Sequence, residues 1–238
     1  MLKAVVRSCL RAAGFELRRI HQDPGPDPLA YVRRVLARTP KPVILDIGAN
    51  VGQSLTTFLA YWPGATIHAF EPARSAFAAL QRNTSGTRGV VLNHCAVGAA
   101  AGSQPFFENS EIVMSSVLET GHEGWGEIVA RYEVPTTTVD QYLDGHGIDR
   151  VHLLKIDTQG SDLSVLAGAA ASLDHHRLVF VFAELNFAEL YRGQCRADEV
   201  LRFMHDRGMP LVGLYDFHYR GDRAGWADGL FVDPRAEY

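Results

Sequence analysis

The chain has 238 residues and a mass of 26.2 kDa, and its 47% apolar and 21% charged residues are typical of one globular α/β domain. The net charge of −4 is unevenly distributed: residues 1–41 hold nine basic and three acidic side chains, or +6, so the remainder carries −10. An acidic main body argues against general nucleic-acid binding, which requires a basic surface.

The cysteines and apolar runs argue against a secreted or membrane-spanning protein. Cys9, Cys95 and Cys195 are odd in number and far apart, so they form neither a disulfide framework nor a C-x-x-C metal site. No apolar run has the length of a membrane span, and Arg7 and Arg11 interrupt the start before a secretory signal could form. We therefore expect a cytoplasmic protein.

The chain divides into an N-terminal arm, residues 1–40, and a main domain, residues 41–238. Residues 1–20 are predicted to form a short amphipathic helix and a strand-like segment. The Pro-rich stretch 23–28 is a linker by composition, and a helix follows over 29–38. The basic arm has two interpretations: peripheral contact with an anionic membrane, or a solvated helix with Arg on its outer face.

Strand and helix patterns alternate along the main domain, which predicts a mostly parallel sheet with right-handed crossovers. The predicted strands cover 43–47, 66–70, 89–94, 151–156, 178–183, 210–215 and 228–232, and the predicted helices cover 53–61, 73–83, 139–144, 161–172 and 196–207. The last two strands are joined without a helix, which favours an antiparallel hairpin at the edge of the sheet.

The alternation is interrupted after Gly98. Short strand-like pieces lie near 104–108 and 132–138, and a polar, Gly-rich excursion separates them over 109–126. Because this insertion is longer than most connections between elements, it is a candidate active-site loop.

Residues 43–52, V-I-L-D-I-G-A-N-V-G, have the pattern of a strand that turns through glycines into a helix, as in nucleotide pockets. A dinucleotide turn has the pattern G-x-G-x-x-G, but Asn50 occupies the position of its second glycine, between Gly48 and Gly52. Asp46 would repel a pyrophosphate and attract an ammonium group, such as that of S-adenosylmethionine (SAM). The turn therefore favours SAM over NAD(P).

Polar residues end several of the predicted strands. Glu71 follows the second strand, 19 residues after the last glycine of the turn, where NAD enzymes and methyltransferases alike hold ribose hydroxyls. Asn93 with His94 end the third strand, and Asp157 and Glu184 end two apolar strands further along. Ligands bind at the carboxyl ends of such strands, so we expect these side chains around one crevice.

These residues suggest how a methyl group could be transferred to oxygen, a reaction that needs alignment of the acceptor and removal of its proton. Asp157 and Glu184 are candidate catalytic carboxylates, and His94 and His218 are candidate bases. Lys155 shares a strand face with Asp157 and either tunes the carboxylates, binds substrate or forms a structural ion pair.

A magnesium ion is one alternative at this crevice. Asp157, Glu184 and Asn186 offer the hard oxygen ligands that Mg²⁺ prefers, and the other interpretation is that they bind the acceptor's hydroxyls without metal. Residues 216–220, D-F-H-Y-R, have two further interpretations: an aromatic wall for the acceptor, or hairpin packing.

Several motifs together resemble the FkbM family of SAM-dependent methyltransferases. They are L-D-I-G-A-N-V-G-Q, F-E-P, H-C-A-V-G, T-T-V-D-Q-Y-L, L-L-K-I-D-T-Q-G-S-D-L-S-V-L-A-G-A and F-A-E-L-N-F. The similarity runs in matching order over about 43–232, while residues 1–40 and 109–126 lie outside the strong match. The resemblance implies a class I methyltransferase fold, a Rossmann-like, seven-stranded, mostly parallel sheet with an antiparallel last strand and helices on both faces.

The resemblance also implies a cofactor site and a reaction. Asp46, Gly48, Asn50 and Gly52 would contact the methionine part of SAM, Glu71 would hold the ribose, and Cys95, Ala96 and Val97 would flank the adenine. The implied reaction is O-methylation, commonly of sugar hydroxyls on glycans, glycolipids or secondary metabolites. Our main hypothesis is thus a SAM-dependent O-methyltransferase with a saccharide-containing acceptor.

Two alternatives belong to other classes. An NAD(P)-dependent oxidoreductase is disfavoured by Asn50 and by the lack of a Tyr-x-x-x-Lys pair near the fourth strand. A non-catalytic SAM-binding domain would keep Asp46 and Glu71 but has no need of acids on the fourth and fifth strands. Both a monomer and an oligomer are compatible with the sequence.

Overall fold

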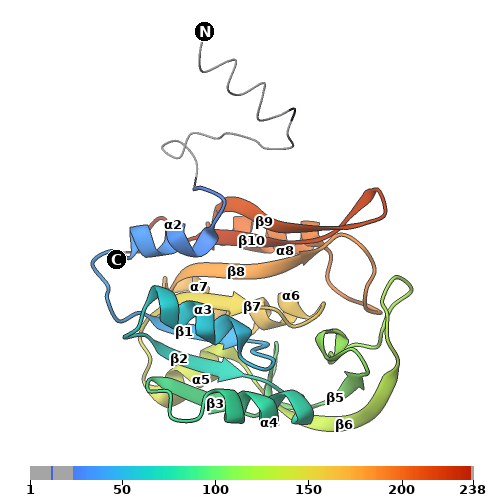
Figure 1. Ribbon diagram of the computed structural model, residues 1–238. Helices are drawn as coiled ribbons and strands as arrows, with labels where there is room; N and C mark the ends of the chain where they lie inside the picture. The colour runs from blue at the N-terminus through green and yellow to red at the C-terminus, as the bar shows by residue number, and fades with distance from the viewer. Residues whose placement is uncertain (1–11, 13–23, 237–238) are drawn as a thin grey trace.

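A seven-stranded sheet forms the centre of the computed structural model, which describes Ala12 and residues 24–236 (Figure 1). Its strand order is β3-β2-β1-β7-β8-β10-β9. The strands are β1 (Val43–Ile47), β2 (Thr66–Phe70), β3 (Val90–Asn93), β7 (Val151–Ile156), β8 (Leu178–Asn186), β9 (Leu211–Arg220) and β10 (Arg223–Val232). The helix and strand-like segment predicted within 1–20 fall outside the described residues, apart from Ala12.

The strand directions confirm the predicted fold class. β1 is parallel to β2 and β7, β2 is parallel to β3, and β7 is parallel to β8. β10 is antiparallel to both β8 and β9, so the last strand in sequence is inserted between them and β9 forms the edge. The predicted antiparallel hairpin is present, with both strands longer than expected.

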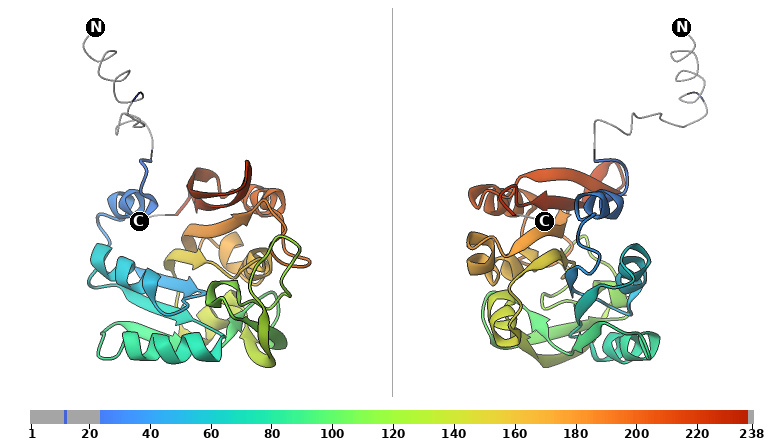
Figure 2. Two further views of the ribbon diagram at one scale, coloured as in Figure 1. Left: turned by 45° about the vertical axis from the view of Figure 1, so that its right-hand side comes forward. Right: turned by 90° about the vertical axis from the view of Figure 1, so that its left-hand side faces the viewer.

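Helices cover both faces of the sheet, as the right-hand view of Figure 2 shows. One face carries α2 (Pro28–Val35), α3 (Gln53–Tyr61) and α4 (Arg74–Asn83); the other carries α5 (Val139–His146), α6 (Asp162–Ala167), α7 (Ala170–Asp174) and α8 (Ala197–Asp206). Successive strand residues enter opposite cores: Ile44 packs with the first group and Leu45 with the second. Within the described residues, none of these helices is long and apolar enough to cross a membrane.

The helix predicted over 161–172 is two helices, α6 and α7. A Cβ on Gly168 would lie only 2.0 Å from the carbonyl oxygen of Gly98, so the chain passes too close there for a side chain. Asp140 of α5 then accepts hydrogen bonds from the backbone N–H groups of Ala171 and Ser172, at 3.0 and 2.8 Å. This carboxylate starts a new helix, because it satisfies donors that have no partner within the helix.

A second, three-stranded sheet contains β4 (Ala96–Val97), β6 (Ile128–Thr137) and β5 (Gly102–Asn109), in that order. Phe106 and Val134 of this sheet pack with Ala76 of α4 and with its N-cap Ala73, so the small sheet is attached to the main domain at the start of α4. The excursion between β5 and β6 includes a short 3₁₀ helix, η1 (Ile112–Met114).

Candidate active site

The turn after β1 brings three strands together at their carboxyl ends. Gly48 and Gly52 have left-handed φ angles of 81° and 99°, and Asn50 has a φ of 48°. The N–H groups of Gly48 and Ala49 both donate to the carbonyl oxygen of Phe70 at the end of β2, each at 3.0 Å. On the other side, a Cβ on Gly48 would lie 1.9 Å from the carbonyl oxygen of Asp157, after β7. The turn is therefore held between its two neighbouring strands.

Glu71 closes this turn from the end of β2. Its carboxylate accepts hydrogen bonds from the N–H groups of Asn50, at 2.8 Å, and Ala73, at 2.7 Å. Only 6% of Glu71 is exposed, and burial raises the pKa of its carboxyl to about 7 despite these hydrogen bonds. Each oxygen has one further lone pair, so Glu71 can still accept hydrogen bonds from a ligand.

Lys155 connects the turn to the end of β7. Its Nζ donates to the carbonyl oxygen of Gly48 at 2.9 Å and lies 3.3 Å from both Asp46 Oδ1 and Asp157 Oδ2. Burial disfavours the ammonium, but the charges of Asp157 and Asp46 outweigh it and raise the pKa of Lys155 above its usual value. Lys155 is thus a fixed cation between two carboxylates.

Asp46 lies beneath the turn. It is fully buried, is paired with Lys155 and accepts a hydrogen bond from Ser54 Oγ on α3. It supports the turn from below and is not among the residues that line the pocket described below. Asp46 lies opposite Lys155 across β1 and β7, one step before both strands end, which explains their pairing. Its contact with a ligand's ammonium group stays a prediction.

Replacing Asp46 by Asn should lower the free energy of unfolding by about 2 kcal/mol. Removing one partner of a buried pair costs about 3–5 kcal/mol, and the loss is smaller here because Lys155 keeps Asp157. Urea unfolding of Asp46→Asn and of the exposed control Asp149→Asn measures it. Equal midpoints for the two variants would contradict the pairing.

A pocket opens over these strand ends and encloses about 670 Å³ of space, including its mouth. Gly48 and Asn50 of the turn line it, together with Glu71 after β2 and Asp157 after β7. The predicted adenine-flanking residues also line it: Cys95, Ala96 and Val97. Gly52 lies further back as the N-cap of α3, where a Cβ would approach a methyl group of Leu80 to 3.1 Å.

The excursion 109–126, predicted to be an active-site loop, does line this pocket. Ile112, Val113 and Ser116 belong to its wall, and the first two are 37% and 46% exposed. Asn109 connects the start of the loop to its end, because its side-chain amide donates hydrogen bonds to Thr120 Oγ1 at 3.2 Å and to the backbone carbonyl of Trp125 at 3.1 Å. In Figure 1 the excursion, which contains η1, connects β5 to β6.

Gln159 is a pocket residue that the sequence patterns did not identify. It follows Asp157 by two positions, lines the pocket and has a left-handed φ of 57°. Its only sequence signal is its place in T-Q-G-S, between a strand end and a helix, where turn geometry is expected.

Glu184 and Asn186 do not reach the pocket. β8 continues to Asn186, so Glu184 lies inside the strand opposite Asp228 of β10 rather than at a strand end. Burial, and secondly the charge of Asp157, raises the pKa of Glu184 well above its usual value, and Asn186 donates to its Oε1 at 3.0 Å.

The predicted magnesium ligands are not assembled. Among the described residues there is no cluster of three or more His, Cys, Asp or Glu side chains that could hold a metal ion. Asp157 lines the pocket, whereas Glu184 and Asn186 are buried within the sheet. The arrangement of the described side chains therefore does not support the magnesium alternative.

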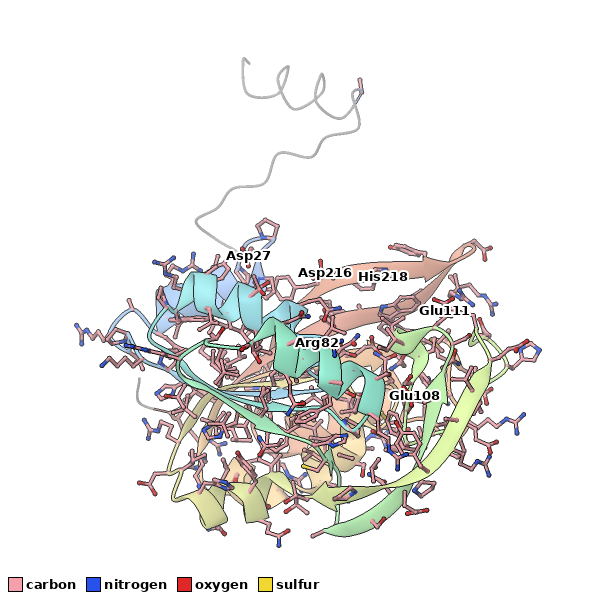
Figure 3. All side chains as sticks on the ribbon, turned by 60° about the horizontal axis from the view of Figure 1, so that its bottom comes forward. Asp27, Arg82, Glu108, Glu111, Asp216 and His218 are labelled. Atoms are coloured by element: carbon pink, nitrogen blue, oxygen red, sulfur yellow. The ribbon has the colours of Figure 1, made fainter. Side chains whose placement is uncertain are left out.

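Neither candidate histidine lines the pocket. His94 stacks on Phe77 of α4, with ring centroids 4.3 Å apart. His218, labelled on β9 in Figure 3, stacks on Trp226 at 4.6 Å, and Trp226 stacks in turn on Trp125 of the excursion. His218 therefore packs within the hairpin, whereas Phe217 and Tyr219 are 44% and 66% exposed and stack on each other, so both interpretations of 216–220 stay open.

Comparison with known proteins places this site in a family. Residues 46–211 match the family described as "Methyltransferase FkbM domain". The 2-O-methyltransferase NoeI of Sinorhizobium fredii (strain NBRC 101917 / NGR234) is 28% identical over 198 residues, covering 79% of this chain and 80% of its own. The 31-O-demethyl-FK506 methyltransferase FkbM of Streptomyces tacrolimicus is 27% identical over 217 residues, covering 80% and 81%.

A solved structure shares the fold. Methyltransferase FkbM from Methylobacillus flagellatus KT superposes with a TM-score of 0.53 at 18% identity, over 86% of this chain. This chain spans 50% of the length of that protein. Because the family match covers most of the chain and the sheet has the implied strand arrangement, the chain belongs to the FkbM family of methyltransferases.

Proposed function

We propose that the protein is a SAM-dependent O-methyltransferase. The observation that carries the proposal is the pocket with Glu71 after β2 and Asp157 after β7, on either side of the β1 turn. In this proposal Glu71 holds the ribose of SAM, and Asp157 accepts a hydrogen bond from the acceptor hydroxyl. One relative above is named a 2-O-methyltransferase and the other a methyltransferase of 31-O-demethyl-FK506, which supports transfer to oxygen.

The residues present fit SAM. Asn50 Oδ1 and Thr158 Oγ1 belong to pocket-lining residues and are buried without a hydrogen-bond partner among the described residues. Such atoms suit a ligand with amine and hydroxyl groups. Ala96 and Val97 offer an apolar wall for adenine, and Glu71 has lone pairs left for the ribose.

Asp157 is the proposed acceptor-side catalytic residue. Bound SAM supplies a methyl group that is ready for displacement. Asp157 lines the pocket with 39% of its side chain exposed, so its carboxylate can accept a hydrogen bond from the acceptor hydroxyl and take up the proton as the oxygen reacts. Lys155 and Gly48 fix Asp157 and the turn relative to each other, which preserves the alignment that in-line displacement needs.

The proposed acceptor is a hydroxyl group of a saccharide, a glycolipid or a glycosylated metabolite. The pocket mouth supports this choice, because the exposed Ile112 and Val113 offer apolar contact near a carboxylate that can bind hydroxyls. Sugar rings present both C–H faces and hydroxyl groups.

Two measurements test the proposed function. Calorimetry with SAM and, separately, with NAD should show binding of SAM alone; binding of NAD without SAM would overturn it. Incubation with labelled SAM and a panel of methyl glycosides should give methylated glycoside by mass spectrometry. SAM binding with no transfer to any glycoside, or to fractionated glycolipids, would leave only a non-catalytic SAM-binding domain.

SAM affinity should fall as the pH decreases through about 7, the pKa of the Glu71 carboxyl. The ionised form accepts two hydroxyl hydrogen bonds, whereas the protonated form gives up part of that capacity. Affinity is therefore highest above pH 7 and falls by up to about tenfold per pH unit below it. Calorimetry between pH 5.5 and 8.5 measures this, and Glu71→Gln should bind more weakly with a flatter profile. An unchanged profile in Glu71→Gln would assign the titration to another group.

A further inference from the structure

Gln159 adopts a backbone conformation that favours glycine. Its φ of 57° is left-handed, and it stands immediately before Gly160, whose φ is 92°. Left-handed geometry is sterically unfavourable for a residue with a Cβ, and a long unbranched side chain gives no local compensation there. Any advantage of glutamine over glycine at this position must therefore come from its side chain.

Both ends of the Gln159 amide are hydrogen bonded. Its Nε2 donates to Asp157 Oδ1 at 2.5 Å, and its Oε1 accepts from the phenol of Tyr191, also at 2.5 Å. Tyr191 is fully buried, and burial raises the pKa of its phenol, so it remains a neutral donor. Because the phenol occupies the amide oxygen, the NH₂ group must face the carboxylate of Asp157.

The Gln159 turn is also attached to the excursion 109–126. Ser116 Oγ donates to the backbone carbonyl of Gln159 at 2.8 Å, and the Tyr191 phenol lies 3.3 Å from the sulfur of Met114. Asp157, Gln159 and Tyr191 therefore form one hydrogen-bonded chain, and the excursion contacts this chain through Ser116 and Met114.

Asp157 is held from two sides as a result. Lys155 Nζ lies 3.3 Å from Oδ2, while Gln159 holds Oδ1. The terminal torsion of an Asp side chain is soft, so a carboxylate held only by Lys155 can turn both oxygens towards the ammonium. With Gln159 in place, the orientation is fixed and the remaining lone pairs stay available to the pocket.

We propose that Gln159 is a positioning residue for methyl transfer: its amide, oriented by the Tyr191 phenol, holds the Asp157 carboxylate in the orientation that receives the acceptor's proton. This inference rests on the proposed function for its kinetic consequence. Its structural content, the orientation of Asp157, does not depend on that function.

Three variants separate the side chain from the turn. Gln159→Gly removes the amide, and glycine adopts a φ of 57° without strain. Gln159→Asn keeps an amide that tolerates the left-handed region but is one methylene too short to span Asp157 and Tyr191. Tyr191→Phe removes only the phenolic donor. Tyr219→Phe, 66% exposed on β9, is the control.

Kinetics with labelled SAM and the best methyl glycoside give the first readout. Gln159→Gly and Gln159→Asn should lower kcat about 30-fold and Tyr191→Phe about fivefold, with the KM for SAM changed less than about twofold. The double variant Gln159→Gly with Tyr191→Phe should be no slower than Gln159→Gly alone, because both act through one chain. The inference would be overturned if the kcat losses of the two single variants multiplied in the double variant. It would also be overturned if Gln159→Gly kept the wild-type kcat or changed only the KM.

Crystal structures give a second readout that needs no activity. In Gln159→Gly both oxygens of Asp157 should turn towards Lys155, whereas in Tyr219→Phe the carboxylate should keep its orientation. An unmoved carboxylate in Gln159→Gly overturns the inference even if the variant is slow. Absence of methyl transfer by the wild-type protein, by contrast, overturns only the proposed function.

Discussion

Asp157→Asn should lower kcat by at least about 100-fold while SAM binding falls much less, because general-base catalysis contributes about 10²- to 10⁴-fold. Asn has the shape of Asp and can still accept one hydrogen bond from Lys155, but it cannot take up the acceptor's proton. Lys155 retains Asp46 as its counter-charge, so the turn after β1 should stay in place. Steady-state kinetics and calorimetry with SAM, measured on the same preparation, separate the two effects.

The matched control for this substitution is Asp144→Asn. Asp144 pairs with Arg177 on the surface, where its side chain is 71% exposed, and surface pairs contribute less than about 1 kcal/mol. Its kcat should equal that of the wild type. If Asp157→Asn kept the kcat of the wild type, the acceptor's proton would have to leave by another route. The pocket would then contribute only the alignment of the acceptor with SAM.

Local patterns were sufficient to predict the parallel part of the sheet. β1, β2 and β7 begin and end where the apolar runs do, because each is buried between two helical layers and is bounded by Gly, Pro or charged residues. β8 is different: the polar residues Glu184 and Asn186 ended the predicted strand, yet pairing with β10 carries the real strand through both. A long-range partner decided that boundary, and a single sequence does not show it.

The same limitation explains the corrections at the site. Strand-end carboxylates were expected in one crevice, and Glu71 and Asp157 do line the pocket. Because β8 continues past Glu184, this residue lies inside the sheet. His218 stacks on Trp226 and does not line the pocket. Gln159 was missed because its role depends on Tyr191, which is distant in sequence and becomes a neighbour only after folding. The sequence indicated which strands end in side chains that could take part in a reaction. Contacts between residues distant in sequence determine which of these side chains line the pocket.

The contact between Gly48 and Asp157 leads to the second large expected effect. A Cβ at Gly48 would lie 1.9 Å from the carbonyl oxygen of Asp157 and 2.9 Å from its carbonyl carbon, and backbone on both sides leaves no flexible side chain to yield. The β1 turn and the end of β7 would have to separate. That movement would also disturb the ammonium of Lys155, which donates to the carbonyl oxygen of Gly48.

Gly48→Ala should therefore lower the free energy of unfolding by about 4 kcal/mol or more, at the upper end for a single substitution, and weaken SAM binding at least about 100-fold. Gly86→Ala is the control, because Gly86 has nearly the same φ, 78° against 81°, but a Cβ added there would have no atom within 4 Å. Left-handed strain alone should cost that control about 1–2 kcal/mol and leave SAM binding unchanged. Urea unfolding and calorimetry with SAM, measured on both variants, separate the effect of the clash with Asp157 from the effect of the left-handed backbone conformation. Equal losses in the two variants would mean that the turn can move away from β7 at no cost, and that this contact does not hold the pocket together.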